Sequence, residues 1–438
     1  MNTLNTIKSY LKTMHKNFLS FFSIFSTQTV TQIFFPPAMI LTWGVEKFGI
    51  WILIVSILPM LTILNINFAL ASRSEMSINL EKKNFKEINV IFQNTFFLVF
   101  FNSIFFLLLW IVIFLIDQFS LKAFEVIKYN DIKLIFLLIV FSAHCTILDQ
   151  LFYCGITYNG DASKYNYNNL LFDTLIKVLI PVAGLLTDNL INAVVIFSIL
   201  QVFKTISLYI IFKIQNKNNL KLKLDLFDIS SSFKIFKLSL SYQLENFSHI
   251  LRNNGLIILI GIFFSPVIVG LISTAKTLFY FLPIRFLDTI NSTLHLEFSK
   301  VYGRNDMTTL KKIYKLHIYI YIFVLFIFFI SSLFFGKLVY DFWTNYKYDL
   351  SYSLLILIIV DSIMFNFYNS AEIFIKSINK FLYSSILKSF LALVTILLSY
   401  ILFSLEYSFL SFFFISIISS FFILFLILLI TFKIFNTH

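Results

Sequence analysis

Long apolar runs, separated by short polar segments, follow one another along the whole chain. Each run lasts about 20 residues or more, the length that a helix needs to cross the hydrocarbon of a bilayer. The run at 318–335 is continuous, whereas membrane strands show alternating segments of about ten residues. The pattern predicts an all-α integral membrane protein with twelve transmembrane helices. The predicted spans are residues 18–41, 49–71, 91–116, 133–157, 169–187, 191–211, 241–264, 267–290, 314–335, 351–374, 382–404 and 408–432.

The composition agrees with this pattern. Of the 438 residues, 59% are hydrophobic and 13% are charged, whereas about a quarter of the residues of a soluble protein are charged. The mean hydropathy is +0.87. Twelve crossings of about 20 residues would use about 240 residues. A soluble enzyme or binding module is therefore excluded.

The basic residues predict the orientation of the spans. The apolar run after Lys8, Lys12 and Lys16 is too long for the core of a signal peptide, so we interpret it as the first retained span. With the N-terminus in the cytoplasm, 22 of the 34 Lys and Arg residues lie on the cytoplasmic side and 6 on the outer side. The positive-inside rule therefore predicts that both termini are cytoplasmic. The net charge of +12 reflects this bias and does not indicate nucleic-acid binding.

Two pairs of residues suggest an internal repeat. Gly49 and Gly270, which open the second and eighth spans, are 221 residues apart, and so are Asn84 and Asn305. Two six-helix halves in the same orientation are an architecture of secondary transporters, with the substrate bound between the halves. The predicted domains are an N-terminal six-helix lobe, a cytoplasmic linker and a C-terminal six-helix lobe, at residues 1–213, 214–240 and 241–438.

Short strings in both halves carry a resemblance to a known family. In the first half they are 43–51 (WGVEKFGIW), 65–68 (NINF) with Arg73, and 80–84 (LEKKN). In the second half they are 252–255 (RNNG), 269–271 (VGL) and 302–306 (YGRND). The chain resembles the Wzx-like polysaccharide flippases of the multidrug/oligosaccharidyl-lipid/polysaccharide (MOP) exporter superfamily. Asn65 and Asn67 stand where that family has Asp and Gly, which puts any role of that carboxylate in doubt.

The resemblance implies a fold and a function. The fold would be MATE-like, with two pseudo-symmetric lobes. The function would be to carry an undecaprenyl-pyrophosphate-linked oligosaccharide, an O-antigen or capsule repeat unit, between the leaflets of the bacterial inner membrane by alternating access. A glycan polymerase and a chain-length regulator of lipopolysaccharide biosynthesis would be partners. The protein would be a transporter and no enzyme.

Twelve ionisable residues fall within the predicted spans, where each is costly unless it faces the interior or a watery cavity. The basic ones are Lys177, Lys204, Arg252, Lys276, Arg285 and Lys388, and the acidic ones are Asp149, Asp173, Glu245, Asp288, Asp361 and Glu372. Lys204 and Lys388 lie near cytoplasmic helix ends, where we expect their side chains to extend to the membrane surface. The spacing of Asp173 and Lys177 predicts a structural intrahelical pair.

Candidate substrate ligands are basic and amide side chains. Arg252 and Lys276 lie near mid-depth without an obvious partner on their own helices. A pyrophosphate cannot enter hydrocarbon alone, so fixed cations must replace its water, and these two residues are our first candidates. The further candidates are Arg285 for the charge and Gln28, Gln32 and Asn253 for sugar hydroxyls. Amides in membrane helices also form interhelical hydrogen bonds, and this interpretation stays open.

The candidates for energy coupling are the carboxylates of Asp361, Asp149 and Glu245. A buried carboxylate can bind and release H⁺ or Na⁺ as access alternates, or it can serve as a static partner of a cation. The sequence leaves both interpretations open. It has neither a phosphate-binding Gly-rich motif nor metal-ligand spacing among its histidines, so we expect no cofactor and no metal. Cys145 and Cys154 are too widely spaced on one helix for a disulfide, and we interpret them as packing residues.

Three alternatives remain. A drug or cation exporter of the same superfamily would need an acidic cleft, whereas the deepest candidate charges are basic. A peptidoglycan-precursor flippase typically has fourteen spans. A multispan glycan polymerase or glycosyltransferase would need a large outer loop, and the longest predicted outer loops, 117–132 and 336–350, are short.

Overall fold

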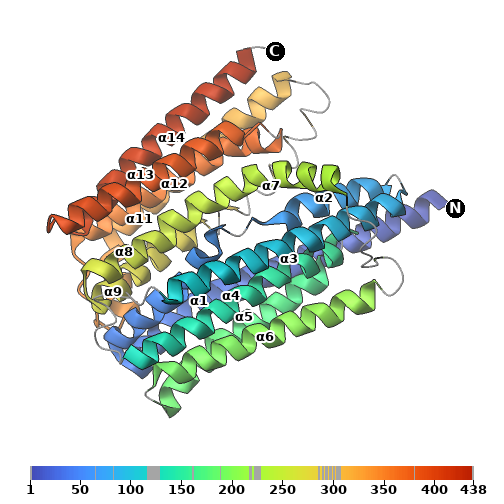
Figure 1. Cartoon of the computed structure of the whole chain (residues 1–438). Helices are drawn as coiled ribbons and strands as arrows, with labels where there is room; N and C mark the ends of the chain where they lie inside the picture. The colour runs from blue at the N-terminus through green and yellow to red at the C-terminus, as the bar shows by residue number, and fades with distance from the viewer. Residues whose placement is uncertain are drawn as a thin grey trace. The chain divides into compact units, whose positions relative to one another are not determined.

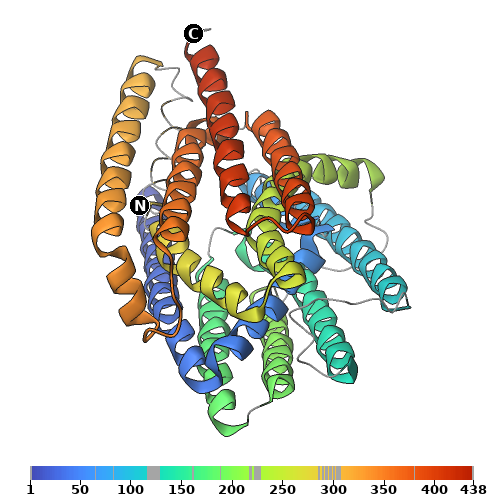
Figure 2. The ribbon, with the colours of Figure 1, turned by 90° about the vertical axis from the view of Figure 1, so that its left-hand side faces the viewer.

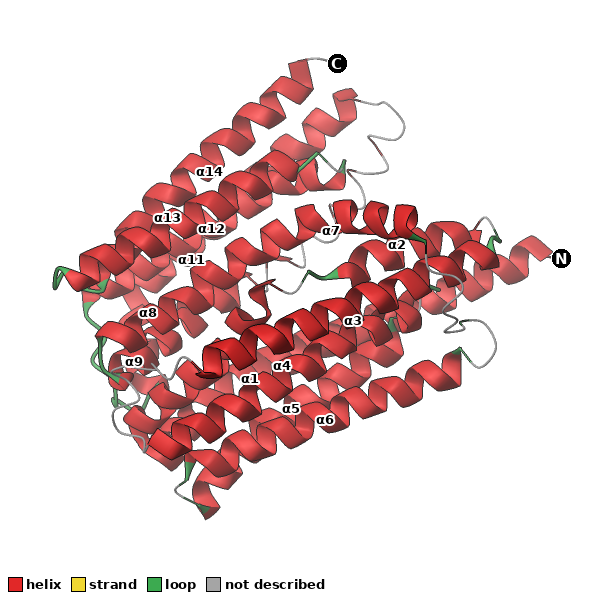
Figure 3. Cartoon of the chain, viewed as in Figure 1, coloured by secondary structure: helices red, strands yellow, loops and turns green. Residues whose placement is uncertain are grey.

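The structure is a computed structural model of the whole chain. It describes residues 2–436 apart from 65, 82, 116–128, 160–161, 188, 217–219, 221–227, 285–286, 289–290, 292–293, 295–297, 299–300, 302–306 and 379. The described residues form helices joined by short connections and contain no strand (Figure 3). They divide into two compact units, which are described separately: the first comprises 2–43 and 57–243, and the second comprises 44–56 and 244–436.

The first unit begins with most of α1 (Asn2–Leu61), followed by a short 3-10 turn (Thr62–Leu64). Its further helices are α2 (Phe68–Glu81), α3 (Phe85–Leu115), α4 (Tyr129–Thr157), α5 (Ser163–Leu186), α6 (Leu190–Gln215) and most of α7 (Ile229–Ile250). Helix α6 packs against both α4 and α5, and the three run side by side (Figure 1). The side chain of Asn189 caps α6 by accepting a hydrogen bond from the backbone nitrogen of Ile191.

The second unit contains two helical segments that are interrupted by π-helical turns. The end of α7 continues into the π turn η4 (Leu251–Gly255) and α8 (Leu256–Phe263), and α9 (Pro266–Lys276) continues into the π turn η5 (Thr277–Phe281). The remaining helices are α11 (Met307–Trp343), α12 (Tyr352–Ser377), α13 (Leu382–Ser404) and α14 (Leu410–Asn436). Helix α14 packs against α12 and α13, drawn in orange to red in Figure 2.

The polarity of the second unit is inverted relative to a soluble protein. Large apolar side chains face outward, as on α11, where Phe323, Phe326 and Phe334 are exposed. Polar side chains such as Arg252 and Lys276 are buried. This distribution is what a lipid solvent requires, because unpaired polar groups are costly in hydrocarbon. Among the described residues, ten helices are long and apolar enough to cross a membrane, so the chain has the character of a multi-pass membrane protein.

The predicted spans and the observed helices differ in several respects. The first predicted span and the start of the second, residues 49–61, lie in the single helix α1, which is broken at Gly44, where φ is 77°. The rest of the second predicted span includes the 3-10 turn and the start of α2. Glycine tolerates this conformation because it has no Cβ. The seventh predicted span is divided by η4, and α7 begins at Ile229, inside the segment predicted as a linker. The count of twelve spans, the two-lobe repeat and the three domain boundaries remain predictions.

Candidate functional site

Arg252 is buried in the second unit and forms an ion pair there. Its Nη2 donates to Oδ1 of Asp361 at 2.6 Å, and its Nη1 donates to the hydroxyl of Ser420 at 2.7 Å. Ser416 donates to the same Oδ1 of Asp361 at 2.8 Å. Arg252 therefore has no acid on its own helix but is not an unmatched cation, because its partner lies on α12, 109 residues away in sequence.

The π turn places Arg252 and Asn253 on a widened segment of backbone. Such turns are rare and occur frequently at functional sites. The guanidinium of Arg252 lies 5.0 Å from the ring centroid of Phe365 and 5.9 Å from that of Tyr368, both on α12. A desolvated guanidinium gains cation–π attraction from such rings. The segment that carries Arg252 therefore holds its cation against α12.

Lys276, at the end of α9, is 3% exposed and has a different kind of partner. Its Nζ donates to the side-chain oxygen of Asn253 at 3.0 Å and lies 4.8 Å from the ring centroid of Tyr280. Among the described residues, no carboxylate lies within ion-pair distance of Lys276. Two of the predicted substrate ligands, Lys276 and Asn253, are thus in direct contact.

Two donors beside this basic pair lack acceptors. Within the described part of the chain, neither Nε of Arg252 nor the hydroxyl of Tyr280 has a hydrogen-bond partner, although both atoms are buried. A buried donor without an acceptor is costly. The unused hydrogen-bonding capacity around Arg252 and Lys276 therefore includes an N–H donor and a hydroxyl that can donate, which suits an anionic or strongly accepting ligand.

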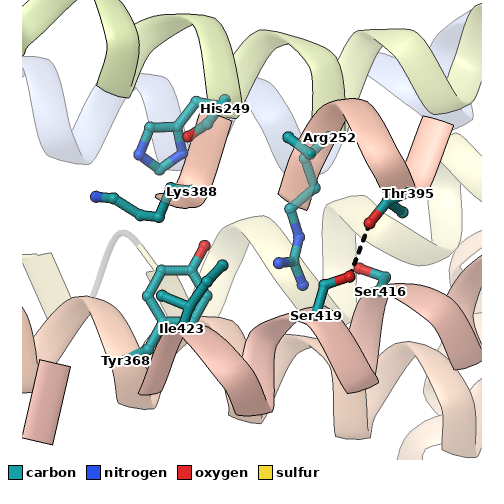
Figure 4. Close-up of a pocket in the computed structure, with 10 residues that line it drawn as sticks. His249, Arg252, Tyr368, Lys388, Thr395, Ser416, Ser419 and Ile423 are labelled. Atoms are coloured by element: carbon teal, nitrogen blue, oxygen red, sulfur yellow. Dashed lines mark hydrogen bonds between the residues drawn. The ribbon is translucent and has the colours of Figure 1, made fainter. Parts of the chain in front are cut away.

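A small cavity lies beside Arg252, between η4, α12, α13 and α14. His249 and Arg252 point into it, together with Lys388, and a hydrogen bond of 2.8 Å joins Thr395 to Ser419 at its edge (Figure 4). The cavity has room for one or two waters. In this conformation it is too small for a pyrophosphate.

A network of four charges joins α7, α12 and α13 near this cavity. Lys388 binds Glu372 at 2.7 Å and Glu245 at 3.3 Å. Lys376 binds Glu245 and also Glu372, the latter at 3.1 Å. The expectation that Lys388 reaches the membrane surface was therefore wrong, because its side chain is 1% exposed and paired. Glu245, a candidate for ion coupling, already contacts two ammonium groups.

Asp149 lies in the first unit, in the interface of α4 and α6. It accepts a hydrogen bond of 2.7 Å from Thr205 and lies 3.9 Å from Nζ of Lys204. The carboxylate is buried, whereas the Lys204 side chain is 15% exposed. All three candidates for ion coupling therefore have a basic side chain nearby, which an incoming H⁺ or Na⁺ would have to outcompete.

The other predicted ligands belong elsewhere in the chain. Gln28 and Gln32 are half-buried on α1 in the first unit, where Lys177 donates to Thr31 at 2.8 Å. Arg285 lies outside the described residues. Both cysteines are free and buried, in agreement with the sequence interpretation. Within the described residues, no group of three or more His, Cys, Asp or Glu is arranged to hold a metal.

Sequence reasoning missed the polar residues that complete the site. They are Tyr280, Ser416 and Ser420. The i to i+4 spacing of Ser416 and Ser420 on one face of an apolar helix was the available signal for the two serines. Glu372 was visible as a charge within a span, but nothing in the sequence pattern shows which lysine it contacts.

The fold is that of known membrane transporters. An inward-facing MATE-family multidrug-resistance transporter of the MOP superfamily matches with a TM-score of 0.61 and 12% identity, over 95% of this chain and 94% of the other. The lipid II flippase MurJ, in an inward closed conformation, matches with a TM-score of 0.65 and 16% identity, over 97% and 87%. A MOP-superfamily transporter from Pyrococcus furiosus, described as having a binding pocket of reverse polarity, matches with a TM-score of 0.58 and 15% identity, over 94% and 95%.

These similarities concern structure and not sequence. No protein-family model and no curated protein sequence matches the chain. At such identities the comparisons establish the fold of MOP-superfamily transporters. The compared proteins are membrane transporters or flippases, and their cargoes differ.

Proposed function

We propose that this protein is a flippase for a lipid-linked oligosaccharide with a pyrophosphate head, such as an undecaprenyl-pyrophosphate O-antigen or capsule unit. The observation that carries the proposal is the donor-rich site of Arg252, Lys276 and Tyr280. Arg252 has one carboxylate partner, Lys276 has an amide partner, and two buried donors are vacant. A phosphoryl group offers several strong acceptors and negative charge to such a site.

The two basic side chains suit different parts of such a cargo. The planar fork of Arg252 can bind two phosphoryl oxygens at once, whereas the ammonium of Lys276 acts as a point charge with three donors. The amide of Asn253, which now accepts from Lys276, is available to sugar hydroxyls once that lysine turns to a phosphate. Gln28 and Gln32 of the first unit would serve the same purpose.

The vacant groups argue against a cationic drug as cargo. The positive charges of Arg252 and Lys276 would repel a cationic cargo, and Nε of Arg252 is a donor, which a cation without an accepting group cannot use. The similarity to the lipid II flippase supports a lipid-linked cargo. The similarity to a drug transporter fits the fold equally well, so the choice between these cargoes rests on the polarity of the site.

The proposal places the protein in the bacterial inner membrane with both termini in the cytoplasm. It would receive cargo from the enzymes that build the glycan on the lipid, and a glycan polymerase with its chain-length regulator would use the product. Energy would come from an H⁺ or Na⁺ gradient through Asp361, Asp149 or Glu245.

The test is surface-glycan assembly in the strain that encodes the protein. We expect that Arg252→Ala and Lys276→Ala each abolish surface glycan, while immunoblots show unchanged abundance in the membrane. Lys347→Ala removes an exposed lysine of the loop between α11 and α12 and should leave the glycan unchanged. Normal surface glycan in both site variants would contradict the proposal.

A further inference from the structure

We propose that Asp361 is a resident counter-ion, which the phosphoryl group of the cargo displaces from Arg252. This inference rests on the proposed function and assigns a role to the acid of the same site. In the empty protein, Asp361 would keep a buried guanidinium from remaining unpaired, which is costly in a dry interior. With cargo bound, the same guanidinium would be paired with phosphate.

Along one edge of the guanidinium of Arg252, only one of the two N–H donors has a hydrogen-bond partner among the described residues. Nε and Nη2 lie on the same edge of a guanidinium and can bind two oxygens of one group in parallel. Asp361 takes Nη2 at 2.6 Å, whereas Nε, although buried, has no partner among the described residues. A phosphoryl group with two oxygens would fill both positions, so it can outcompete a carboxylate that fills one.

Asp361 accepts few hydrogen bonds that would hold it at Arg252. Both hydrogen bonds that it accepts from described residues end on Oδ1, one from Arg252 and one from Ser416. Because both contacts end on the same oxygen, a carboxylate that turns away from Arg252 would also leave the hydroxyl of Ser416. The small cavity is lined by Ser416 and Arg252 and has room for water, so a displaced carboxylate would find hydration there.

Lys276 favours the exchange. Its ammonium contacts an amide and aromatic rings but no described carboxylate, so it adds attraction for an incoming anion without holding Asp361 in place. The hydroxyl of Tyr280 adds a further vacant donor beside it. The phosphoryl group would thus gain contacts on Arg252, Lys276 and Tyr280, while Asp361 exchanges its two hydrogen bonds for water in the small cavity.

The experiment compares the binding of inorganic pyrophosphate to the purified full chain by titration calorimetry. Asp361→Asn keeps the shape and an accepting oxygen but removes the charge that competes for Arg252. We expect pyrophosphate to bind at least about ten-fold more tightly, the size of one charge-assisted hydrogen bond. Asp341→Asn is the matched control, because the carboxylate of Asp341 lies 3.9 Å from Nζ of Lys337 and not at Arg252. This variant should bind pyrophosphate with the affinity of the wild type.

A milder variant keeps the inference falsifiable if Asp361→Asn does not fold. Ser416→Ala removes one hydrogen bond from Asp361 and leaves every charge in place. The carboxylate becomes easier to displace, so we expect pyrophosphate to bind about five-fold more tightly. Ser411→Ala is its control and should bind pyrophosphate like the wild type, because Ser411 lies at the start of the same helix and donates to the backbone oxygen of Ser408.

The outcomes separate the inference from the proposed function. If the wild-type protein does not bind pyrophosphate, the proposed function and the inference both fail. If the wild type binds and the folded Asp361→Asn or Ser416→Ala protein binds equally or more weakly, the inference alone is overturned. Asp361 would then be a structural partner of Arg252, because losing a structural partner does not increase affinity.

Discussion

Gly49 lies directly against the backbone carbonyl of Pro266 in the second unit. A Cβ built on Gly49 would lie 1.8 Å from the oxygen of Pro266. Gly270, which the sequence pairs with Gly49, is similarly close to another group, since its Cβ would lie 2.0 Å from the hydroxyl of Tyr348. Both glycines therefore permit close approach of the segment after Gly44 to α9 and its surroundings, where no larger residue fits.

This packing predicts that Gly49→Ala destabilises the protein. The added methyl group meets rigid backbone at the start of α9, so α9 or the segment 44–56 must shift, and we expect a loss of about 1–3 kcal/mol. Thermal unfolding of the purified protein, followed by tryptophan fluorescence, measures the change. Gly255→Ala is the control, because its Cβ would meet the flexible end of Ile396 at 2.9 Å. An unchanged Tm for Gly49→Ala would show that the two segments do not pack in this way.

Tyr348, in the loop between α11 and α12, provides a prediction about pH. Its hydroxyl donates to the carbonyl of Val45 at 3.2 Å, and burial raises the pKa of Tyr348 well above its usual value. Tyr348→Phe should therefore cost about 1 kcal/mol at neutral pH.

The sign of the pH effect follows from the raised pKa. The neutral side chain is favoured in the folded state, so its stabilising contribution is complete below the unfolded pKa of about 10 and is lost as the pH rises above it. The difference in Tm between wild type and Tyr348→Phe should be constant from about pH 7 to 9 and shrink at about pH 10–11. A difference that shrinks below pH 9 would contradict the burial of this hydroxyl.

The charge network predicts non-additive effects on stability. Glu372→Gln removes one of the two acids of the network, so among the described residues only Glu245 remains to pair with Lys388 and Lys376. Breaking a buried ion pair costs about 3–5 kcal/mol. Adding Lys388→Met removes a buried cation that has lost its nearer acid, so the double variant should be more stable than Glu372→Gln alone. A double-mutant cycle of Glu372→Gln and Lys388→Met should give a coupling energy of about 0.5–3 kcal/mol. If chemical denaturation gives additive effects, Lys388 and Glu372 do not interact as described.

The sequence predicted the helical membrane architecture well, because a bilayer imposes one rule on every span. Apolar runs of sufficient length show where helices cross, and the cost of buried charge marks Arg252, Lys276 and Asp361 as residues to examine. The partners of these charges depend on how helices that are distant in sequence pack together. The pair of Arg252 with Asp361 and the burial of Lys388 against Glu372 could not be read from any single span.

Two local features also escaped prediction for physical reasons. The π turns at 251–255 and 277–281 leave no mark in the hydrophobic pattern, because each changes the register of the helix by a single residue. The vacant donors of Arg252 and Tyr280 depend on the positions of individual atoms. The sequence therefore indicates which residues matter, whereas their hydrogen bonds and ion pairs become visible only in the folded structure.

The central claim is that Arg252 and Lys276 accept the pyrophosphate of a lipid-linked cargo. The most direct measurement reconstitutes the purified protein in vesicles and follows two fluorescent polyprenyl glycans across the bilayer, one with a pyrophosphate link and one with an uncharged link. The account predicts translocation of the pyrophosphate-linked lipid alone, and its loss in Lys276→Ala. Equal movement of both lipids, or transport of a cationic dye in place of either, would contradict it.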